Sequence, residues 1–314
     1  MIMKYVVKKM GVLIAMLFLV SFITFIAFSV IPGDSAITAL GIDATEEAIE
    51  AMRTSLGLND PIPVRYLRWV KDVITGDFGS SIQYNMKVST LIGDKLPVTV
   101  SLAILSVLLI TVFGIPLGVW IAKARSKKVQ DLIALITQVF MSIPPFFLGM
   151  LLTLLFGILL KWFTPGGYIS YKENFAGFLS YLIFPAIAIA IPKISMVAKF
   201  TASSIRREMG LDYVRTAYSK GDTRNQVFRH HILKNSMMPV VTFMGMIIAD
   251  VLAGSIIVEQ VFNIPGLGRL LVSSIGNRDL FVVQAIILYI VTVVIVVNFI
   301  VDLIYQILDP RVRM

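Results

Sequence analysis

Side chains that commonly perform catalysis or bind metal ions are scarce in this sequence. It contains no cysteine, and its two histidines, His230 and His231, are adjacent in a polar stretch. Two neighbouring histidines without any thiolate do not suit a transition-metal site. No G-x-x-x-x-G-K-S/T phosphate loop occurs, and no serine forms a recognisable nucleophile–base arrangement with the histidines. We therefore expect no catalytic residue, no metal site and no bound cofactor in this chain.

One ionisable residue, Asp250, lies deep inside an apolar run that extends from Met237 to Val258. A charge in such a run is costly, and it usually faces a water-filled cavity or a polar partner. Asp250 is therefore a candidate for lining a solute pathway. A structural hydrogen bond to a neighbouring helix is the alternative interpretation, and both stay open at this point.

The apolar runs that surround this residue are long enough to span a membrane. Hydrophobic residues make up 57% of the 314 residues and charged residues only 15%. Roughly 20 apolar residues of helix cross a hydrocarbon core about 30 Å thick. We therefore predict an all-α integral membrane protein with about six transmembrane helices. The predicted spans are Met10–Ile31, Pro97–Ala122, Val129–Leu160, Leu179–Val197, Met237–Val258 and Leu280–Leu308.

The first and third predicted spans each have an unusual feature. The first follows Lys4, Lys8 and Lys9 and resembles a signal peptide, but its apolar core is too long and no clear cleavage site follows, so we expect an uncleaved helix. The third is longer than one crossing requires, which predicts a tilt or a break near the pair Pro144-Pro145.

The basic residues predict the orientation. Lysine and arginine gather at the N-terminus, after the second span, between the fourth and fifth spans and at the C-terminus. Because basic loops stay on the cytoplasmic side, both termini are expected inside the cell. Basic loops near membrane lipid also account for the formal net charge of +9. No compact basic domain with stacking aromatic residues indicates a nucleic-acid partner.

The chain is thus expected to have four parts. Residues 1–31 hold the first transmembrane helix, and 32–95 form an extracytoplasmic loop with two short helices, one from Thr45 to Gly57 and one from Pro61 to Ile74. Residues 96–308 form the membrane core with five more helices, and 309–314 form a cytoplasmic tail.

A polar cytoplasmic segment, residues 199–235, divides the fourth span from the fifth. Within it, Tyr213 to Tyr218 predicts a short helix that Gly221 would end. A short helix held between two membrane helices is suited to act as a lever that a cytoplasmic partner could grip. From the residues alone, an ordinary solvated loop near anionic lipid is an equally good interpretation.

Sequence motifs along nearly the whole chain resemble one family of transporters. The polar segment contains DYVRTAYSKG, followed by VFRHHILKNSMMPV. Further motifs are IPGD at 31–34, LGLNDPIPVRYLRWVKDVITGDFGSSI at 56–82, IPLGVW at 115–120, SIPPFFLG at 142–149, AGSIIVEQVFNIPGLGRLL at 253–271 and DPRVR at 309–313. Their order and spacing are similar to those of permease subunits of oligopeptide/dipeptide-type (peptide/nickel branch) ABC importers.

The resemblance implies a type I ABC importer permease fold in the bacterial or archaeal cell membrane. It also implies three kinds of partner: a second homologous permease, two cytoplasmic ATPase subunits that use ATP and magnesium, and an extracytoplasmic solute-binding protein. In this family a short cytoplasmic helix couples the permease to the ATPase. Carried over to this sequence, the coupling helix and its end consist of Asp212, Tyr213, Val214, Arg215, Thr216, Ala217, Tyr218, Lys220 and Gly221.

The sequence departs from the broader importer pattern within this segment. That pattern opens with Glu-Ala-Ala, whereas Arg215-Thr216-Ala217 stands here, and the proline of the pattern comes late, at Pro239. The peptide branch of these permeases has this variant, so the departure narrows the resemblance to that branch.

A second candidate site is the turn formed by Pro265, Gly266, Leu267 and Gly268, which we expect on the outer face. There it would either receive the solute-binding protein or close the outer vestibule.

The predicted function is ATP-driven import of di- or oligopeptides, without enzymatic activity of this chain. Import of nickel or a metal chelate by the same architecture is the alternative. An ion-coupled secondary transporter would favour several intramembrane charges and often an internal repeat, whereas Asp250 is nearly alone.

Overall fold

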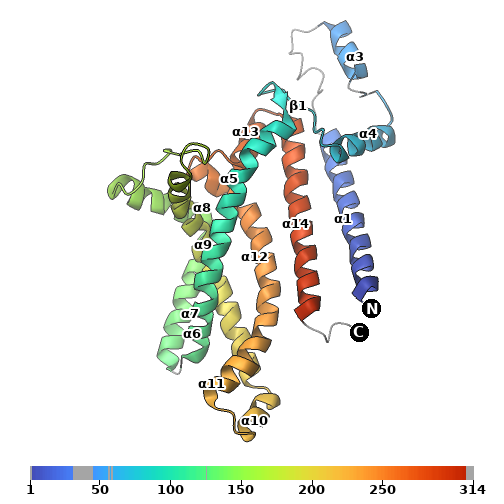
Figure 1. Cartoon of the computed structure of the whole chain (residues 1–314). Coiled ribbons are helices and arrows are strands. Elements are labelled where there is room, and N and C mark those ends of the chain that lie inside the picture. Colours follow the sequence, from blue (N-terminus) through green and yellow to red (C-terminus); the bar gives the residue numbers. More distant parts are fainter. Residues whose placement is uncertain (1, 31–44, 56, 58, 125, 309–314) are drawn as a thin grey trace. The chain divides into compact units, whose positions relative to one another are not determined.

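The computed structural model describes residues 2–30, 45–55, 57, 59–124 and 126–308. The predicted tail at 309–314 and the start of the first loop at 32–44 lie outside these residues. The described chain is helical almost throughout, with one short hairpin (Figure 1). The elements are α1 (Ile2–Val30), α3 (Glu46–Ser55), α4 (Ile62–Ile74), β1 (Ser80–Ser81), β2 (Met86–Lys87), α5 (Val88–Leu109), η1 (Ile110–Gly114), α6 (Ile115–Lys123), α7 (Lys127–Ser142), α8 (Pro145–Leu152), η2 (Thr153–Leu159), α9 (Phe175–Met209), α10 (Asp212–Ser219), α11 (Arg224–Gln226), η3 (Val227–Leu233), α12 (Lys234–Val261), α13 (Leu267–Gly276) and α14 (Leu280–Leu308).

Five helices in the described ranges are long and apolar enough to cross a membrane, or six if one bent pair counts as a single span. The five are Val7–Val30, Val88–Lys123, Phe175–Met209, Arg224–Val261 and Leu280–Ile304. The bent pair is α7 with α8–η2, which meet at 93°. The break predicted near Pro144-Pro145 is therefore confirmed. Proline lacks an amide hydrogen and disfavours helical geometry in the residue before it.

Two of the long helices contain π-helical stretches. The stretch η1 joins α5 to α6, and η3 joins α11 to α12. The elements α5–η1–α6 and α11–η3–α12 are therefore each one continuous helix. The first stretch ends just before Pro116, whose missing amide hydrogen the wider turn accommodates. Three predicted spans are longer than expected: the second begins at Val88 instead of Pro97, α9 continues twelve residues beyond Val197 to Met209, and the fifth begins at Arg224 instead of Met237.

The chain forms two compact units. One consists of residues 1–6, 98–269 and 296–314, and the other of residues 7–97 and 270–295. In the first unit α9 is central and contacts α6, α7, α8 and α12. Its buried core includes Leu102 and Ile110 from α5 and η1, Leu182 and Ile189 from α9, and Val251 from α12.

Small residues bring α6 and α9 close together in this unit. A side-chain carbon placed on Gly118 would overlap Thr201 and lie 2.7 Å from the carbonyl oxygen of Ala198. At the end of η1, a side-chain carbon on Gly114 would lie only 3.1 Å from the Val197 side chain. Without a hydrophobic force between helices in lipid, such close backbone approach is a main source of helix association.

In the second unit an aromatic cluster attaches α4 to α1. Tyr66 makes edge contacts with the rings of Phe18, Phe22 and Phe25. The hydroxyl groups of Tyr66 and Ser21 lie 2.8 Å apart, within hydrogen-bonding distance. The predicted helix from Pro61 to Ile74 is confirmed, and its apolar face packs on the first span.

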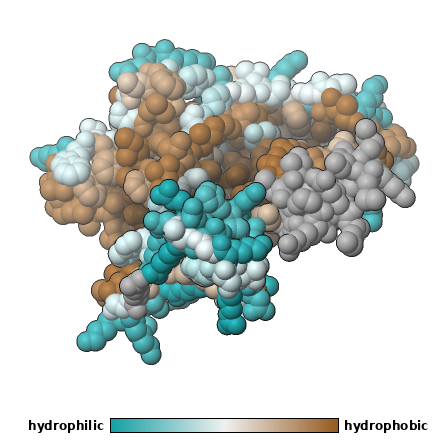
Figure 2. Space-filling view, turned by 60° about the horizontal axis from the view of Figure 1, so that its bottom comes forward, coloured by the Kyte–Doolittle hydropathy of each residue, from teal (hydrophilic) through white to brown (hydrophobic). Residues whose placement is uncertain are grey.

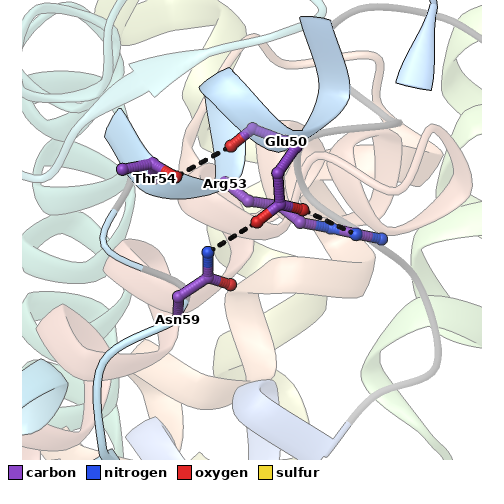
Figure 3. Close-up of polar contacts among 4 residues, drawn as sticks. All are labelled: Glu50, Arg53, Thr54 and Asn59. Atoms are coloured by element: carbon purple, nitrogen blue, oxygen red, sulfur yellow. Dashed lines mark hydrogen bonds and ion pairs between the residues drawn. The ribbon is translucent and has the colours of Figure 1, made fainter. Parts of the chain in front are cut away.

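The other predicted short helix of this loop, α3, is also confirmed, and its polar contacts show how it joins the following turn (Figure 3). The Glu50 carboxylate accepts hydrogen bonds from Arg53 at 3.2 Å and from Asn59 at 2.8 Å. The Thr54 hydroxyl donates to the Glu50 carbonyl oxygen at 2.9 Å. Gly57 ends the pattern with φ +64°, a conformation that suits glycine.

Candidate functional site

The predicted helix in the polar segment forms as α10, and its end has a defined geometry. Gly221 has φ +93°, its amide donates to the Tyr218 carbonyl oxygen at 3.0 Å, and the Asp222 amide donates to Ala217 at 3.3 Å. These two bonds form a Schellman motif, which requires a left-handed residue that glycine supplies most easily. The prediction that Gly221 ends the helix is confirmed.

One face of α10 is buried against the two neighbouring membrane helices. Val214 and Ala217 are 4% and 6% exposed, and they belong to a cluster with Ile205 of α9 and with Val227 and Ile232 of η3. Because Val214 and Ala217 share one buried cluster with residues of both helices, we expect a displacement of α10 to reach α9 and the η3–α12 helix.

Polar contacts fix the loops on both sides of α10. The Tyr213 hydroxyl donates to the Glu208 carboxylate at 2.6 Å. Burial, together with this hydrogen bond, raises the pKa of Tyr213 above its ordinary value, so the hydroxyl stays protonated and keeps donating. On the other side Thr223 and Gln226 form a reciprocal capping box at the start of α11. The connection between α9 and α11 is thus ordered structure.

The opposite face of α10 points to solvent. Asp212 and Arg215, 3.7 Å apart, have side chains 96% and 83% exposed. Viewed with the end that carries α10 and α11 turned forward, hydrophilic residues gather in front, and hydrophobic surface lies behind them (Figure 2). The other exposed residues on and just after α10 are Thr216, Tyr218, Ser219, Lys220 and Gly221.

A cavity of about 490 Å³ lies beside α10. Tyr218 of α10 and Arg224 of α11 line it, together with Lys123 and Phe228. The Lys123 ammonium lies 4.0 Å from the centroid of the Phe228 ring, a cation–π contact. The surface around α10 is therefore a polar helix face next to a basic hollow.

Asp250 lies on α12 and forms an ion pair with Lys193 of α9. The Lys193 side chain is 15% exposed, whereas that of Asp250 is 53% exposed. Lys193 is thus the polar partner of Asp250 on a neighbouring helix, and about half of the Asp250 side chain remains exposed. Lys193 lies inside the predicted fourth span, but it was not identified from the sequence as the partner of Asp250. Its position directly after Pro192, within an otherwise apolar stretch, could have indicated membrane depth.

We expect loss of either charge to lower the amount of folded protein, in a defined order. Asp250→Asn leaves the mostly buried Lys193 ammonium without its partner, whereas Lys193→Met leaves a carboxylate that is half exposed. The asparagine variant should therefore be the worse of the two, because an unpaired charge costs most where it is buried. The measurement is the monodisperse yield of detergent-extracted protein on size-exclusion chromatography.

The charge-swapped double variant, Lys193→Asp with Asp250→Lys, tests the pair itself. It should recover much of the yield that the worse single variant loses. A double variant as poor as that single variant would show that the ion pair does not stabilise the fold.

Glu259, near the end of α12, is fully buried. Its carboxylate accepts from the Thr99 hydroxyl at 2.7 Å and from the amides of Gly268 and Arg269 at 2.7 and 3.2 Å. The Thr99 hydroxyl oxygen in turn accepts from the Leu267 amide at 2.8 Å. These contacts cap the N-terminus of α13, where a helix favours a negative group.

The turn predicted at residues 265–268 is partly helical. Leu267 and Gly268 form the first turn of α13, and only Pro265 and Gly266 precede the helix. A side-chain carbon on Gly266 would overlap the Glu259 carboxylate, and one on Gly268 would overlap the Ile256 backbone. These glycines are required by close packing. Glu259 was not among the predicted site residues, although any acid within a membrane helix indicates a cavity or a polar partner, as Asp250 does.

The three groups share one helix. The α10 cluster packs against η3, which leads directly into α12, Asp250 lies along α12, and Glu259 lies at its far end (Figure 1). The structure therefore connects the candidate residues through α12 and does not bring them together in one cavity.

Comparison with known proteins identifies relatives over the whole length. A model described as "Binding-protein-dependent transport system inner membrane component" matches residues 114–314, and the model of its N-terminal region matches residues 2–103. A probable peptide ABC transporter permease of Sinorhizobium fredii is 34% identical, over 98% of this chain and 99% of its own length. An oligopeptide transport system permease of Bacillus subtilis is 33% identical, with the same coverage. A glutathione transport system permease of Salmonella paratyphi A is 36% identical over 99% of both chains.

The matched ranges include the residues of α10, of the ion pair and of the Glu259 cap. The apolar helices agree with the inner-membrane location in the family description. This chain is a multi-pass inner-membrane protein that belongs to the family of binding-protein-dependent transport system inner membrane components.

Proposed function

We propose that this chain is one of two permease subunits of an ATP-driven importer for peptides or closely related solutes. The observation that carries the proposal is the seating of α10. Its Val214 and Ala217 pack against both adjoining membrane helices, while its other face is polar and exposed. Such a helix transmits a push from a cytoplasmic partner directly into the membrane. The names of the relatives support a peptide-like solute.

In this proposal α10 lies in the cytoplasm, with both chain termini, and two ATPase subunits bind and hydrolyse ATP with magnesium. The residues from Asp212 to Gly221 form the coupling helix. The second permease and this chain enclose the solute pathway, into which the half-open Asp250 faces. The N-terminus of α13 then lies on the outer side, where a solute-binding protein delivers its cargo, and Glu259 holds that surface in place.

The test is reconstitution of this chain with its second permease, the ATPase subunits and the solute-binding protein in vesicles. We expect uptake of a short labelled peptide that needs ATP and all the subunits, and none from this chain alone. Uptake by this chain alone, driven by an ion gradient, would contradict the proposal, as would failure of the ATPase subunits to co-purify with this chain.

A further inference from the structure

A cavity of about 540 Å³ in the second unit is not used by the proposed transport cycle. It lies between the C-terminal end of α1, the helix α4 and the start of α14. Aromatic rings line it, among them Phe25 of α1, Trp69 of α4 and Phe281 of α14. Its polar lining consists mainly of side chains from α4 and from the turn before it. We call it the α4 pocket.

The charges in the α4 pocket are not all paired with each other. Arg68 and Asp60 form an ion pair at 2.7 Å. Arg65 and Asp72 also line the pocket, and neither forms an ion pair with another side chain of the described residues. The Arg65 guanidinium lies 6.0 Å from the centroid of the Phe25 ring. One cation and one anion thus remain available to a ligand.

The helix places these two charges on the same side. Arg65, Arg68 and Asp72 follow one another at intervals of three and four residues, so they share a face. Two helical turns, or about 10 Å of rise, separate Arg65 from Asp72. The long Arg65 side chain can extend along the helix toward Asp72, whose short side chain keeps its carboxylate close to its own turn. A ligand that bridges them must carry a negative and a positive group a few ångströms apart.

The surroundings of the α4 pocket suit a lipid. The side of α4 away from the charged face exposes large apolar residues, with Leu67 at 66% and Ile74 at 79%. On α1, Phe18 and Phe22 are 59% and 42% exposed. An amphipathic helix with aromatic residues, packed on the end of a transmembrane span, is typical of the membrane interface. Acyl chains can lie on this apolar surface while a headgroup enters the pocket.

We propose that the α4 pocket binds the zwitterionic headgroup of a phospholipid. The Arg65 guanidinium binds the phosphate, for which its planar pair of donors is well suited. The Asp72 carboxylate binds the ammonium group of an ethanolamine headgroup. The four charged side chains that line the pocket sum to zero, which favours a zwitterion over a purely anionic lipid. A peptide carries the same two charges, but it has no acyl chains to cover the exposed apolar side chains.

The test measures lipid binding to the full chain, purified in detergent with its partner subunits. After delipidation, phosphatidylethanolamine is added and retained lipid is counted by native mass spectrometry on the folded, monodisperse fraction. We expect Arg65→Gln to lower the affinity about tenfold or more, the effect of losing a charge-assisted hydrogen bond. The matched control is Lys71→Gln, which removes a cation from the exposed side of the same helix outside the pocket and should bind as the wild type does.

Two further measurements separate the alternatives. Asp72→Asn should abolish the preference for phosphatidylethanolamine over phosphatidylglycerol, while binding of the phosphate continues. Equal lipid binding by wild type and Arg65→Gln would overturn the proposal. So would an Arg65-dependent thermal shift with a millimolar dipeptide that phosphatidylethanolamine does not produce, because the pocket would then be a solute site. Neither result depends on whether the complex imports peptides.

Discussion

Replacing Glu259 by alanine is expected to prevent accumulation of most of the folded protein. The variant leaves the Thr99 hydroxyl and the amides of Gly268 and Arg269 without their acceptor, in a buried place. Each unsatisfied buried donor costs about 1–3 kcal/mol, so the loss in free energy of unfolding is about 3 kcal/mol or more. Thermal unfolding of the detergent-solubilised protein, followed by its monodisperse fraction, measures the effect.

Graded variants distinguish the cap from a general effect of removing an acid. Glu259→Gln keeps the side-chain length and one acceptor oxygen, and should be milder than alanine. Thr99→Val removes only the hydroxyl group and should also lower stability. Glu173→Ala, an identical change at an exposed loop position, should leave stability unchanged. If Glu259→Ala unfolds at the wild-type temperature, the hydrogen bonds to α13 do not stabilise the fold.

Reversing the charge of Arg215 is expected to abolish transport without unfolding the protein. Its side chain is 83% exposed, and it forms an ion pair with Asp212, whose side chain is 96% exposed, so Arg215→Glu should accumulate at the wild-type level. On the outward face of the proposed coupling helix, Arg215 would pair with an acidic group of the ATPase. A glutamate there places two like charges against each other, which costs several kcal/mol. Uptake by the reconstituted importer should therefore fall at least about tenfold, while the ATPase subunits continue to hydrolyse ATP.

The control for this experiment is Lys128→Glu, a charge reversal at another exposed residue of the first unit, on α7. It lies outside α10 and should transport normally. A contrasting variant, Val214→Asp, places a charge in the buried cluster of α10 and should reduce the folded yield. Wild-type uptake by Arg215→Glu would contradict the assignment of α10 as the coupling helix.

Local patterns in the sequence predicted local structure well. Apolar periodicity with glycine at the ends indicated α3, α4 and α10, and the proline pair indicated the break between α7 and α8. These features depend on residues close together in the chain, where turn geometry and proline chemistry determine the outcome. The ends of α9 and of the α11–α12 helix were not predicted, because hydropathy measures the apolar stretch and not the helix that continues beyond it.

Contacts between distant residues could not be predicted from the sequence in the same way. Thr99 and Glu259 are 160 residues apart, and Lys193 and Asp250 are 57 apart. Each single residue could be identified as unusual in an apolar run, but its partner depends on which helices pack together and in what rotation. The hairpin of β1 and β2 was missed for a simpler reason, since two-residue strands have too little pattern to detect.

The π-helical stretch η3 has a consequence for everything that follows it on α12. A helix advances 100° per residue, so the wider turns of η3 set the direction in which each later side chain points. Inserting one residue into the regular α-helix that follows η3, before Asp250, would rotate the rest of α12 by about 100°. Asp250 would turn away from Lys193, and Glu259 would turn away from Thr99, although no residue of either pair had changed. The angular phase of the helix is thus set at its cytoplasmic end in the proposed orientation, and the contacts at its far end depend on that phase.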